Sequence, residues 1–477
     1  MTKKFYVTCA IPYVNAAPHV GHALEFVQGD VIARYHRLLG EDTLLLCGGD
    51  ENALKNVQAA EKAGTPVQEF IDANNIKFYE LTKALGCQFD IWQKGSDHTH
   101  HFPSSQKLWE LCKRDIYKKS YEGLYCVGCE LFYEPEELSE DGECFEHPGK
   151  KLEKVSEENY FFRLSKYQQA LIDLITSSKL TIIPIFRKNE VLSFLKQPLQ
   201  DISISRTNER AKNWGVPVPD DDTERMYVWF DALNIYQSGI GFGWDNAQYE
   251  KWWPADVHVI GKGISRFHAI YWPAFLLSAG LATPKAIFIH GYFTVNGQKM
   301  SKTLGNVIDP FELVQKYGAD PLRYYFLREI PSTADGDFSE RRFKELYNAD
   351  LANNLGNAVS RVARLCANSG FSFNKSELLI NPRYTTHETE DFNNLRFDKV
   401  LRMIWVGVEA VNEIFDKNKP WEQKGGDLHT TLKSCVSILL NTAWELQPFL
   451  PETAKKILKQ FAGPTIKSEA PLFPRLT

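Results

Sequence analysis

Residues 5–47 contain the pattern that most restricts how this chain can fold: a strand, a sharp turn, a helix and a second strand. Residues 5–11 are rich in β-branched and aromatic side chains, as in a buried strand. Apolar residues then recur on one helical face from Ala23 to Leu39, Gly40 gives a stop signal, and residues 43–47 form another apolar run. This unit predicts an α/β domain with a parallel sheet, in which ligands bind at the carboxyl ends of the strands.

The turn from Pro12 to His22 carries candidate ligand-binding side chains. Two prolines and Gly21 let the backbone turn sharply, and His19 and His22 stand three positions apart at the predicted helix start. The unpaired N–H groups of a helix start favour anions, so a polyphosphate would fit here. Histidine pairs are common at helix starts, and two solvated surface histidines are the alternative.

A second cationic stretch follows about 280 residues later. Lys299 and Lys302 come just after Asn296-Gly297, a dipeptide typical of hairpin turns between apolar runs. We therefore expect both lysines on a loop just past a hairpin. A solvated charged surface is the alternative for such a run taken by itself.

Together, His19-Val20-Gly21-His22 and Lys299-Met300-Ser301-Lys302 resemble the two signatures of the class I aminoacyl-tRNA synthetases, in the same order. The resemblance implies that His19, His22, Lys299 and Lys302 are catalytic and that ATP, with Mg²⁺, is bound by His19, Gly21, His22, Glu25, Lys299 and Lys302. The implied fold is α/β, with a Rossmann-type nucleotide-binding catalytic domain, an inserted zinc-knuckle connective domain and a C-terminal all-α anticodon-binding bundle.

Length and charge bound the possible functions. A chain of 477 residues is long for a single core, and 43% hydrophobic with 24% charged residues is typical of globular proteins. The net charge of −5 gives no overall attraction to nucleic acid, so RNA contacts would need local basic patches. We find no signal peptide and no run approaching ~18 apolar residues. The sequence predicts a cytoplasmic protein without membrane association.

Three of the nine cysteines cluster at metal-ligand spacing. Cys126 and Cys129 form one pair, and Cys144 and His147 form another, each with two intervening residues. Such pairs can close a tetrahedron around one structural Zn²⁺ with no open position. The segment has little apolar surface, so the metal would serve as its core. Unconnected thiols at chance spacing are the alternative.

A candidate pocket follows the second strand. Asp50 at its end could pair with a substrate amine, although an N-cap role at the next helix fits the spacing equally. Trp229 and Tyr236 could wall an apolar pocket, closed by His268 and Trp272 at i, i+4 on a later helix. Each aromatic residue, taken singly, also suits an ordinary core.

Other groups of polar residues have plain structural interpretations. The string from Ser96 to His101 lacks a cysteine or carboxylate partner at ligand spacing, and we expect its histidines to be solvated. Asn357 and Arg361 share a helical face, and Trp421 follows Pro420 near another helix start. A surface polar pair and a core tryptophan are the plain interpretation of these three residues.

Across the whole chain, the motifs resemble the methionyl-tRNA synthetase family, in the bacterial type with one zinc knuckle. The family's methionine pocket maps to Ile11, Tyr13, Asp50, Trp229, His268 and Trp272, its zinc ligands to Cys126, Cys129, Cys144 and His147, and its anticodon contacts to Asn357, Arg361 and Trp421. Three positions depart from the family pattern: Asn52 and Ala53 replace a histidine and a glycine, and Gly263 replaces an aspartate.

The resemblance implies five segments: a first catalytic half (1–115), a connective insertion (116–220), a second catalytic half (221–290), a lysine-loop and connecting segment (291–342) and a helical anticodon-binding domain (343–477). The expected function is ATP-dependent activation of L-methionine and its transfer to tRNA(Met), by a monomer without an obligate protein partner. The alternatives are a non-catalytic tRNA-binding or regulatory relative and a class I synthetase for another amino acid.

Overall fold

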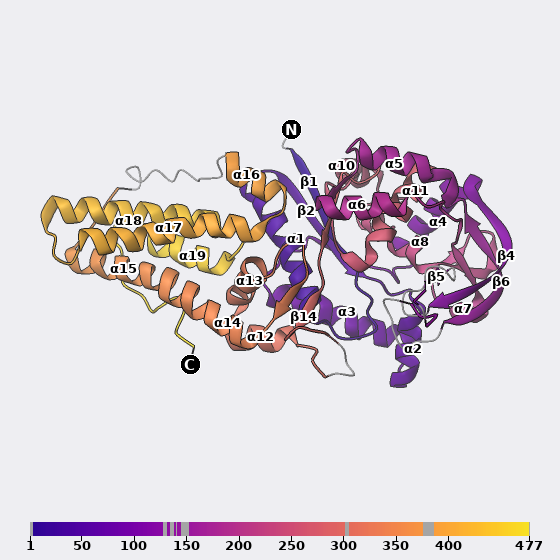
Figure 1. Ribbon diagram of the computed structural model, residues 1–477, viewed down its shortest axis with the longest axis horizontal. Coiled ribbons are helices and arrows are strands. Elements are labelled where there is room, and N and C mark those ends of the chain that lie inside the picture. The colour runs from indigo at the N-terminus through magenta and orange to yellow at the C-terminus, as the bar shows by residue number, and fades with distance from the viewer. Residues whose placement is uncertain are drawn as a thin grey trace. The chain divides into compact units, whose positions relative to one another are not determined.

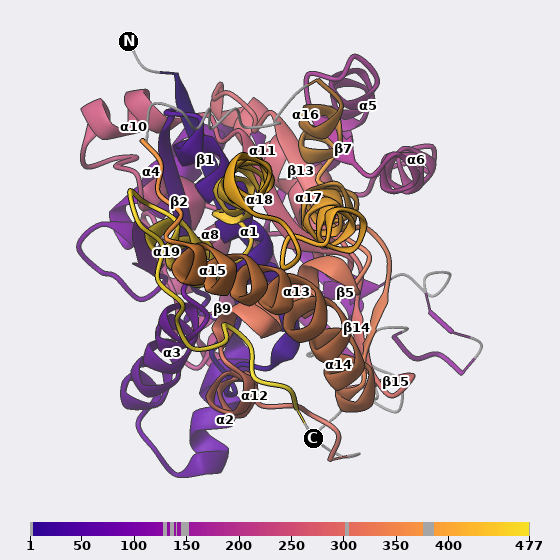
Figure 2. The ribbon, with the colours of Figure 1, turned by 90° about the vertical axis from the view of Figure 1, so that its left-hand side faces the viewer.

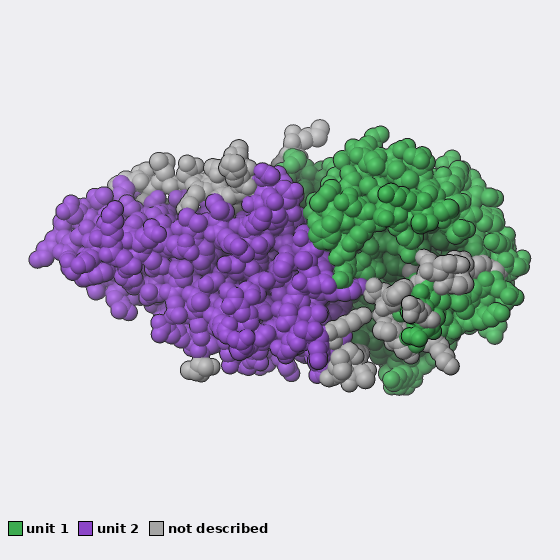
Figure 3. Space-filling view, in the orientation of Figure 1, with its two compact units in different colours: residues 1–18, 40–82, 88–289 green, residues 19–39, 83–87, 290–477 purple. Residues whose placement is uncertain are grey.

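The computed structural model describes residues 3–126, 131–133, 138–139, 141–144, 152–300, 305–374 and 386–476. The chain divides into two compact units (Figure 3). Unit 1 comprises residues 1–18, 40–82 and 88–289, and unit 2 comprises residues 19–39, 83–87 and 290–477. No helix among the described residues is long and apolar enough to cross a bilayer.

Unit 1 is built on a six-stranded sheet with the order β3-β2-β1-β12-β13-β7. The strands are β1 (Lys4–Cys9), β2 (Asp42–Gly49), β3 (Ile91–Lys94), β7 (Thr181–Ile183), β12 (Val257–Gly261) and β13 (Ala286–His290). The pairs β1/β2, β2/β3, β1/β12 and β13/β7 are parallel, which confirms the predicted parallel α/β fold. Since β1 pairs with β2 on one side and with β12 on the other, the strand order reverses there, where such sheets bind ligands.

Unit 1 also contains a set of helices (Figure 1) and a core rich in aromatic side chains. The helices are α2 (Leu54–Ala63), α3 (Val67–Ala84), α4 (His101–Cys112), α5 (Gln168–Thr176), α6 (Ile185–Phe194), α7 (Asn208–Ala211), α8 (Val228–Ala232), α9 (Ile235–Ser238), α10 (Asn246–Trp252) and α11 (Trp272–Ala279). Phe275 of α11 meets Phe162 and Phe230 with ring centroids 4.9 and 4.8 Å apart. Phe230 in turn meets Trp109 of α4, so α4, α8 and α11 share one core.

The segment between β3 and β12 adds two small antiparallel sheets to unit 1. One has the order β5-β4-β6-β8 and the other β10-β11-β9. Their strands are β4 (Ile116–Cys126), β5 (Leu131–Tyr133), β6 (Glu153–Phe162), β8 (Ile202–Ser203), β9 (Ser205–Thr207), β10 (Pro217–Val218) and β11 (Asp221–Met226). Figure 1 shows β4 and β6 as a long curved pair, in register from Ile116 opposite Phe162 to Tyr125 opposite Glu153.

Unit 2 combines α1 (Val20–Leu38), a three-stranded sheet and the helical C-terminal part. The sheet has the order β15-β14-β16, with β14 (Phe293–Val295), β15 (Gln298–Lys299) and β16 (Gly336–Phe338). The helices are α12 (Pro310–Tyr317), α13 (Ala319–Arg328), α14 (Glu340–Leu346), the π-helical η6 (Tyr347–Gly356), α15 (Asn357–Ser369), α16 (Thr386–Asn393), α17 (Phe397–Asn418), α18 (Gly425–Leu446) and α19 (Pro451–Gln460).

The C-terminal helices form the predicted bundle. On α17 the buried residues recur every three or four positions, from Phe397 through Leu401, Ile404 and Val408 to Phe415. This spacing gives one apolar stripe that must be covered by another element. Helix α17 packs against α18, and α18 packs against α19 (Figures 1 and 2).

A fully buried arginine joins the elements of unit 2. Arg323 of α13 contacts Asp30 of α1, with 2.7 Å between the guanidinium nitrogen and the carboxylate oxygen. Its remaining donors reach the carbonyls of Phe449 and Pro448, each at 2.8 Å. Asp30 also accepts a hydrogen bond of 2.7 Å from Arg34. The buried Asp30 carboxylate is therefore compensated by two arginines, Arg323 and Arg34.

We predict that Arg323→Met lowers the free energy of unfolding by about 3 to 5 kcal/mol, because it removes a buried cation from the Asp30 carboxylate and a donor from two carbonyls. Chemical denaturation monitored by circular dichroism measures this change. Arg341→Met is the matched control: Arg341 is 81% exposed and pairs with Glu345 on the same helix. Its loss should cost about 0.5 kcal/mol or less. Equal effects of the two substitutions would contradict the role given to Arg323.

Candidate active site

The start of α1 is built by two histidines that cap one another's backbone. His19 is the N-cap residue, and its Nδ1 accepts a hydrogen bond of 3.1 Å from the Gly21 N–H. The Nδ1 of His22 accepts one of 3.1 Å from the His19 N–H. A neutral imidazole that accepts through Nδ1 carries its proton on Nε2. Both rings therefore present an Nε2–H donor, which suits a phosphate oxygen.

Burial favours the neutral form of His22. It lowers the pKa of His22 well below its ordinary value, and the nearby His19 ring lowers it further. The two ring centroids are 3.9 Å apart. Gly21 makes this pairing possible, because a Cβ at that position would lie 2.9 Å from Cε1 of His19. His22 thus offers a hydrogen-bond donor without adding charge.

The two signature stretches meet within unit 2. A Cβ on Gly21 would lie 3.7 Å from Cε of Met300, so the second stretch comes next to the first. Glu25, one turn further along α1, lies 2.9 Å from Nε2 of His290. The second ring nitrogen of His290 is 2.8 Å from the carbonyl of Gly291. His290 was not predicted from the sequence, and it orients the Glu25 carboxylate.

The predicted hairpin before the lysines is confirmed. Asn296 and Gly297 both have positive φ angles, 50° and 75°, as a two-residue hairpin turn requires. Lys299 ends β15 opposite Thr294 of β14. Lys302 lies outside the described residues, as does the side chain of Lys299, so the placement of the two ammonium groups stays a prediction.

In unit 1, Tyr13 and Asp50 lie side by side at the carboxyl end of β2. They form a parallel bridge, and the Asp50 N–H donates to the Pro12 carbonyl at 2.9 Å. Asp50 is 2% exposed. Helix α2 starts at Leu54 with Ala53 as its N-cap and without a side-chain cap bond. The alternative that Asp50 caps this helix is therefore wrong.

Two predicted pocket residues, Tyr13 and His268, contact the indole of a third, Trp229. This ring stacks on Phe267 at 3.6 Å and meets Tyr13 and His268 edge-on at 6.1 and 6.2 Å. The indole N–H of Trp229 is buried and has no hydrogen-bond partner among the described residues. The same holds for Trp272, which is fully buried. The two indole donors are therefore available to a bound molecule or to water.

Ile11 and Trp272 complete the predicted set less directly. Ile11 is partly buried and packs against the same core as Trp229. Trp272 lies four residues after His268 and meets Trp253 edge-on at 6.1 Å. Both residues thus pack in the same core as Trp229, and their place in the pocket stays a prediction. Gly263 lies in the short turn Lys262–Ile264 after β12, and nothing among the described residues explains the missing carboxylate there.

His268 is held in one tautomer. It lies in the π-helical segment η5 (Phe267–Tyr271), with Nδ1 3.0 Å from the Ile264 carbonyl and Nε2 2.8 Å from the Tyr236 hydroxyl. A carbonyl only accepts, so Nδ1 carries the proton and Nε2 accepts from Tyr236. Burial lowers the pKa of His268 to about 4. The pocket therefore has a neutral imidazole at pH 7.

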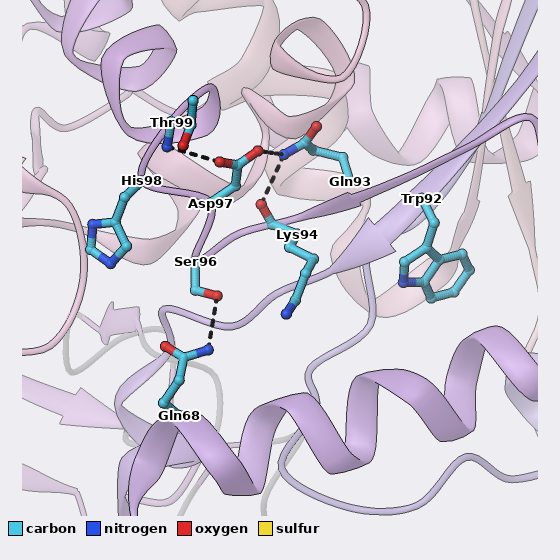
Figure 4. A pocket seen from close by; sticks show the side chains of 8 residues that line it. All are labelled: Gln68, Trp92, Gln93, Lys94, Ser96, Asp97, His98 and Thr99. Atoms are coloured by element: carbon cyan, nitrogen blue, oxygen red, sulfur yellow. Dashed lines mark hydrogen bonds between the residues drawn. The ribbon is translucent and has the colours of Figure 1, made fainter.

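One expectation about the string from Ser96 to His101 is wrong. His101 is fully buried at the start of α4 and contacts Asp231 of α8. Its spacing with Ser105 and Leu108, at i+4 and i+7, is a helical core signal that could have identified it. The rest of the string is more open and borders a hollow of about 530 Å³ (Figure 4). This hollow is lined by Gln68, Trp92, Gln93, Lys94, Ser96, Asp97, His98 and Thr99, none of which was predicted to bind a ligand.

Lys55 was also missed by the sequence interpretation. It lies in the first turn of α2, and its Nζ is 2.9 Å from the centre of the Tyr13 ring. A cation over an aromatic face is attracted by the ring electrons. No pattern in the sequence predicts the contact between Lys55 and Tyr13, because the fold brings these two distant residues together.

Two of the four proposed zinc ligands are described. Cys126 ends β4 and Cys144 follows in the same segment, with exposed fractions of 3% and 1%. The Sγ of Cys144 is 3.4 Å from the Tyr133 hydroxyl. Cys129 and His147 lie outside the described residues. Within the described part of the chain, no three potential ligands are grouped around a metal position.

The predicted RNA-binding residues meet on the helical part of unit 2. The Arg361 guanidinium of α15 is 4.6 Å from the Phe415 ring and 5.9 Å from the Trp421 ring. Trp421 is 53% exposed, so the alternative of a core tryptophan is wrong. Asn357 is exposed one helical turn before Arg361. These groups offer a cation, an amide and an open ring face.

Comparisons with known proteins point to one family. A family model described as tRNA synthetases class I (M) matches residues 5–363. The chain is 40% identical to methionine–tRNA ligase of Thermotoga maritima, over 96% of this chain and 75% of the relative. It is 40% identical to that of Brucella melitensis, over 98% and 93%. It also resembles Mycobacterium tuberculosis methionyl-tRNA synthetase in complex with methionyl-adenylate, with a TM-score of 0.90 and 36% identity over 99% and 100% of the two chains.

The neutral state of His268 predicts a dependence of stability on pH. Its pKa is about 4 in the folded protein and 6.5 ordinarily, so the unfolded chain binds a proton first as the pH falls. The free energy of unfolding should therefore decrease from pH 7 to pH 5, with about 2 kcal/mol coming from His268. Burial also lowers the pKa values of His22 and His258, which act in the same direction.

Denaturant titrations at pH 7, 6 and 5 measure this loss in the wild type and in His268→Gln. We expect the loss on acidification to be about 2 kcal/mol smaller in the variant. Identical pH slopes in the two proteins would show that His268 is not held neutral.

Proposed function

The chain belongs to the methionine–tRNA ligase family of class I aminoacyl-tRNA synthetases, and from this membership we propose that it joins L-methionine to tRNA(Met) in two steps. Methionine is first activated with ATP to methionyl-adenylate, and the methionyl group then passes to the tRNA. One observation carries the proposal: the rings of Tyr13, Trp229 and His268 gather at the same sheet edge as the buried Asp50 carboxylate.

The unit 1 pocket suits methionine in both charge and shape. The aromatic rings would contact the flexible, polarizable thioether, and the neutral imidazole of His268 avoids placing a charge beside it. The Asp50 carboxylate would pair with the substrate ammonium group, a favourable interaction because the carboxylate is shielded from water. Trp272 and Ile11 would complete the apolar wall.

The activation step needs positioning and charge stabilisation more than covalent chemistry. The methionine carboxylate attacks the α-phosphorus of ATP, and pyrophosphate leaves. The Nε2–H groups of His19 and His22 would donate to the phosphates, and Lys299 and Lys302 would neutralise the negative charge that develops on pyrophosphate. Close approach of the nucleotide to the backbone is allowed at Gly21, and Glu25, oriented by His290, is proposed to bind ATP as well.

Mg²⁺ would come with ATP. The described groups at the start of α1 are mainly hydrogen-bond donors, so the ion would be held through the phosphate oxygens, as is usual for nucleotide sites. It would supply further neutralisation of phosphate charge.

The helical part of unit 2 is proposed to select the tRNA. Trp421 would stack on an unpaired anticodon base, and Asn357 and Arg361 would bond to base edges, which is how single-stranded RNA loops are generally recognised. Residues 343–477 would then be the anticodon-binding domain, following the connective insertion (116–220), the second catalytic half (221–290) and the connecting segment (291–342).

The zinc knuckle is proposed to hold one structural Zn²⁺. Two observations support it: Cys126 and Cys144 are both buried, and β4 and β5 pair with Cys126 opposite Leu131, which leaves only residues 127–130 between them. Cys129 lies in this short connection. With His147, the four side chains would form a closed shell without a catalytic position.

The test of function is ATP–pyrophosphate exchange with each of the twenty amino acids. We expect exchange with methionine alone. His22→Ala should lower the rate roughly a hundredfold, by loss of one donor to the phosphates.

Trp421→Ala should leave exchange within about twofold and lower tRNA(Met) aminoacylation at least about fivefold, through loss of base stacking.

Exchange with a different amino acid would contradict the methionine pocket. Binding of tRNA(Met) without exchange for any amino acid would favour the non-catalytic tRNA-binding alternative. Loss of exchange in Trp421→Ala would contradict the proposal that Trp421 acts in tRNA selection alone.

Metal analysis tests the knuckle. Purified protein should contain one zinc ion per chain, and Cys144→Ser should lose it, because a hydroxyl is a poor ligand in a thiolate site. Cys366→Ala is the matched control, since Cys366 is equally buried but lies in α15. Full zinc content in Cys144→Ser would contradict the assignment.

A further inference from the structure

A buried polar network includes a second residue of α8, besides Trp229. Its centre is Asp231, which is 1% exposed and stands two residues after Trp229. One carboxylate oxygen of Asp231 accepts a hydrogen bond of 2.7 Å from the side-chain amide of Asn52. The other contacts Nε2 of His101, with the Ser105 hydroxyl 3.4 Å away. None of these partners has a role in the function proposed above.

Both partners of Asp231 are themselves fixed. The amide nitrogen of Asn52 also donates to the Gly95 carbonyl at 2.8 Å. The other ring nitrogen of His101 is 2.8 Å from the Ser238 hydroxyl. Since these groups are buried, each bond lost would leave a polar atom without water to replace it. The network therefore holds the Asp231 carboxylate at one place relative to β2, α4 and α9.

The network connects the two ends of the methionine pocket. Asn52 lies two residues after Asp50, which is proposed to bind the ammonium group, and Asp231 lies two residues after Trp229, which is proposed to wall the side chain. The Asn52–Asp231 hydrogen bond joins these two segments across 179 positions of sequence. A shift in this bond would change the distance between the carboxylate and the indole.

Helix α8 has little local support of its own. It is five residues long, and its N-cap residue Tyr227 makes no side-chain cap bond. So short a helix is not stable by itself, and tertiary contacts must determine its position. Phe230 makes apolar contacts with Trp109 and Phe275, and such contacts tolerate small displacements of the helix. The hydrogen bonds of Asp231 are directional and do not.

We propose that Asp231, with Asn52 and His101, forms a set of positioning residues that determines how this chain binds and selects methionine. The proposal rests on the function proposed above and extends it to residues that would not touch the substrate. It also assigns a role to Asn52, which replaces the histidine usual at this position.

A purely structural role makes a different prediction. If the network only stabilised unit 1, its loss would lower the melting temperature and the fraction of active enzyme, but the folded enzyme would keep its Michaelis constants. A positioning role changes the Michaelis constant for methionine and leaves that for ATP unchanged. The two roles are therefore separable by kinetics.

The test measures ATP–pyrophosphate exchange in full-length Asn52→Ala, His101→Gln and Asp231→Asn. We expect the KM for methionine to rise roughly tenfold or more, with the KM for ATP within about twofold, because displacement of a positioning group is costly for the ligand that it orients. Discrimination between methionine and norleucine, measured as the ratio of kcat/KM values, should fall in the same variants.

His100→Gln is the matched control. His100 precedes His101 in sequence, but its side chain is 42% exposed and pairs with Asp97 instead. We expect this variant to keep both Michaelis constants and the selectivity of the wild type.

A second measurement does not depend on catalysis. Saturating methionine should raise the melting temperature of the wild type, because a ligand that binds the folded state stabilises it. The rise should shrink in the network variants, while the rise caused by ATP should not. Should Asp231→Asn fail to fold, Asn52→Ala and His101→Gln, which keep the carboxylate, carry the test.

Each outcome decides the proposal. A selective increase in the KM for methionine supports it. Unchanged constants, or equal increases for methionine and ATP, overturn it, as does a lower melting temperature alone. Absence of methionine-dependent exchange in the wild type would instead refute the proposed function, so the two failures are distinguishable.

Discussion

The parallel pairing of β1 with β2 and β12 is the constraint on which the unit 1 site depends. It places the ends of strands that are distant in sequence at one edge, so that Tyr13 meets Asp50 and the segment after β12 delivers His268. The pairing holds Val7 opposite both Leu45 and Val257. A slip of one residue would turn the buried side chains of β1 to the other face of the sheet. The pocket is therefore only as well defined as the register of these three strands.

Hydrogen-bond partners select the tautomer of the histidines in both units. His268 donates through Nδ1 to a carbonyl, whereas His19 and His22 accept through Nδ1 from backbone N–H groups. The same side chain thus has opposite tautomers in the two places, because its hydrogen-bond partner differs. In unit 2 the Nε2–H groups of His19 and His22 are proposed to donate to an anion. In unit 1 the imidazole becomes a polar but uncharged part of an aromatic wall.

Departures from the family pattern have different physical meanings. Asn52 is well accommodated, since its amide bonds to both Gly95 and Asp231. Ala53 serves as the N-cap of α2 without a side-chain bond, and the neighbouring Asn56 side chain bonds to the Asp50 carbonyl instead. A residue that differs from relatives can therefore belong to a complete local network, and its effect must be judged from its partners.

The sequence by itself determined the elements and the local motifs: strand β1, the histidine pair at the start of α1, the Asn296-Gly297 hairpin and the apolar stripe of α17. These features follow from spacings of two to four residues, which reflect the periods of strand, turn and helix. The aromatic pocket was predicted through family resemblance together with such spacings. Only the tertiary structure decided that Asp50 does not cap α2, that His101 is buried against Asp231 and that Lys55 lies over Tyr13. The reason is physical: a buried polar group takes whichever partner the packing of distant segments brings within about 3 Å, and local periodicity carries no information about that partner.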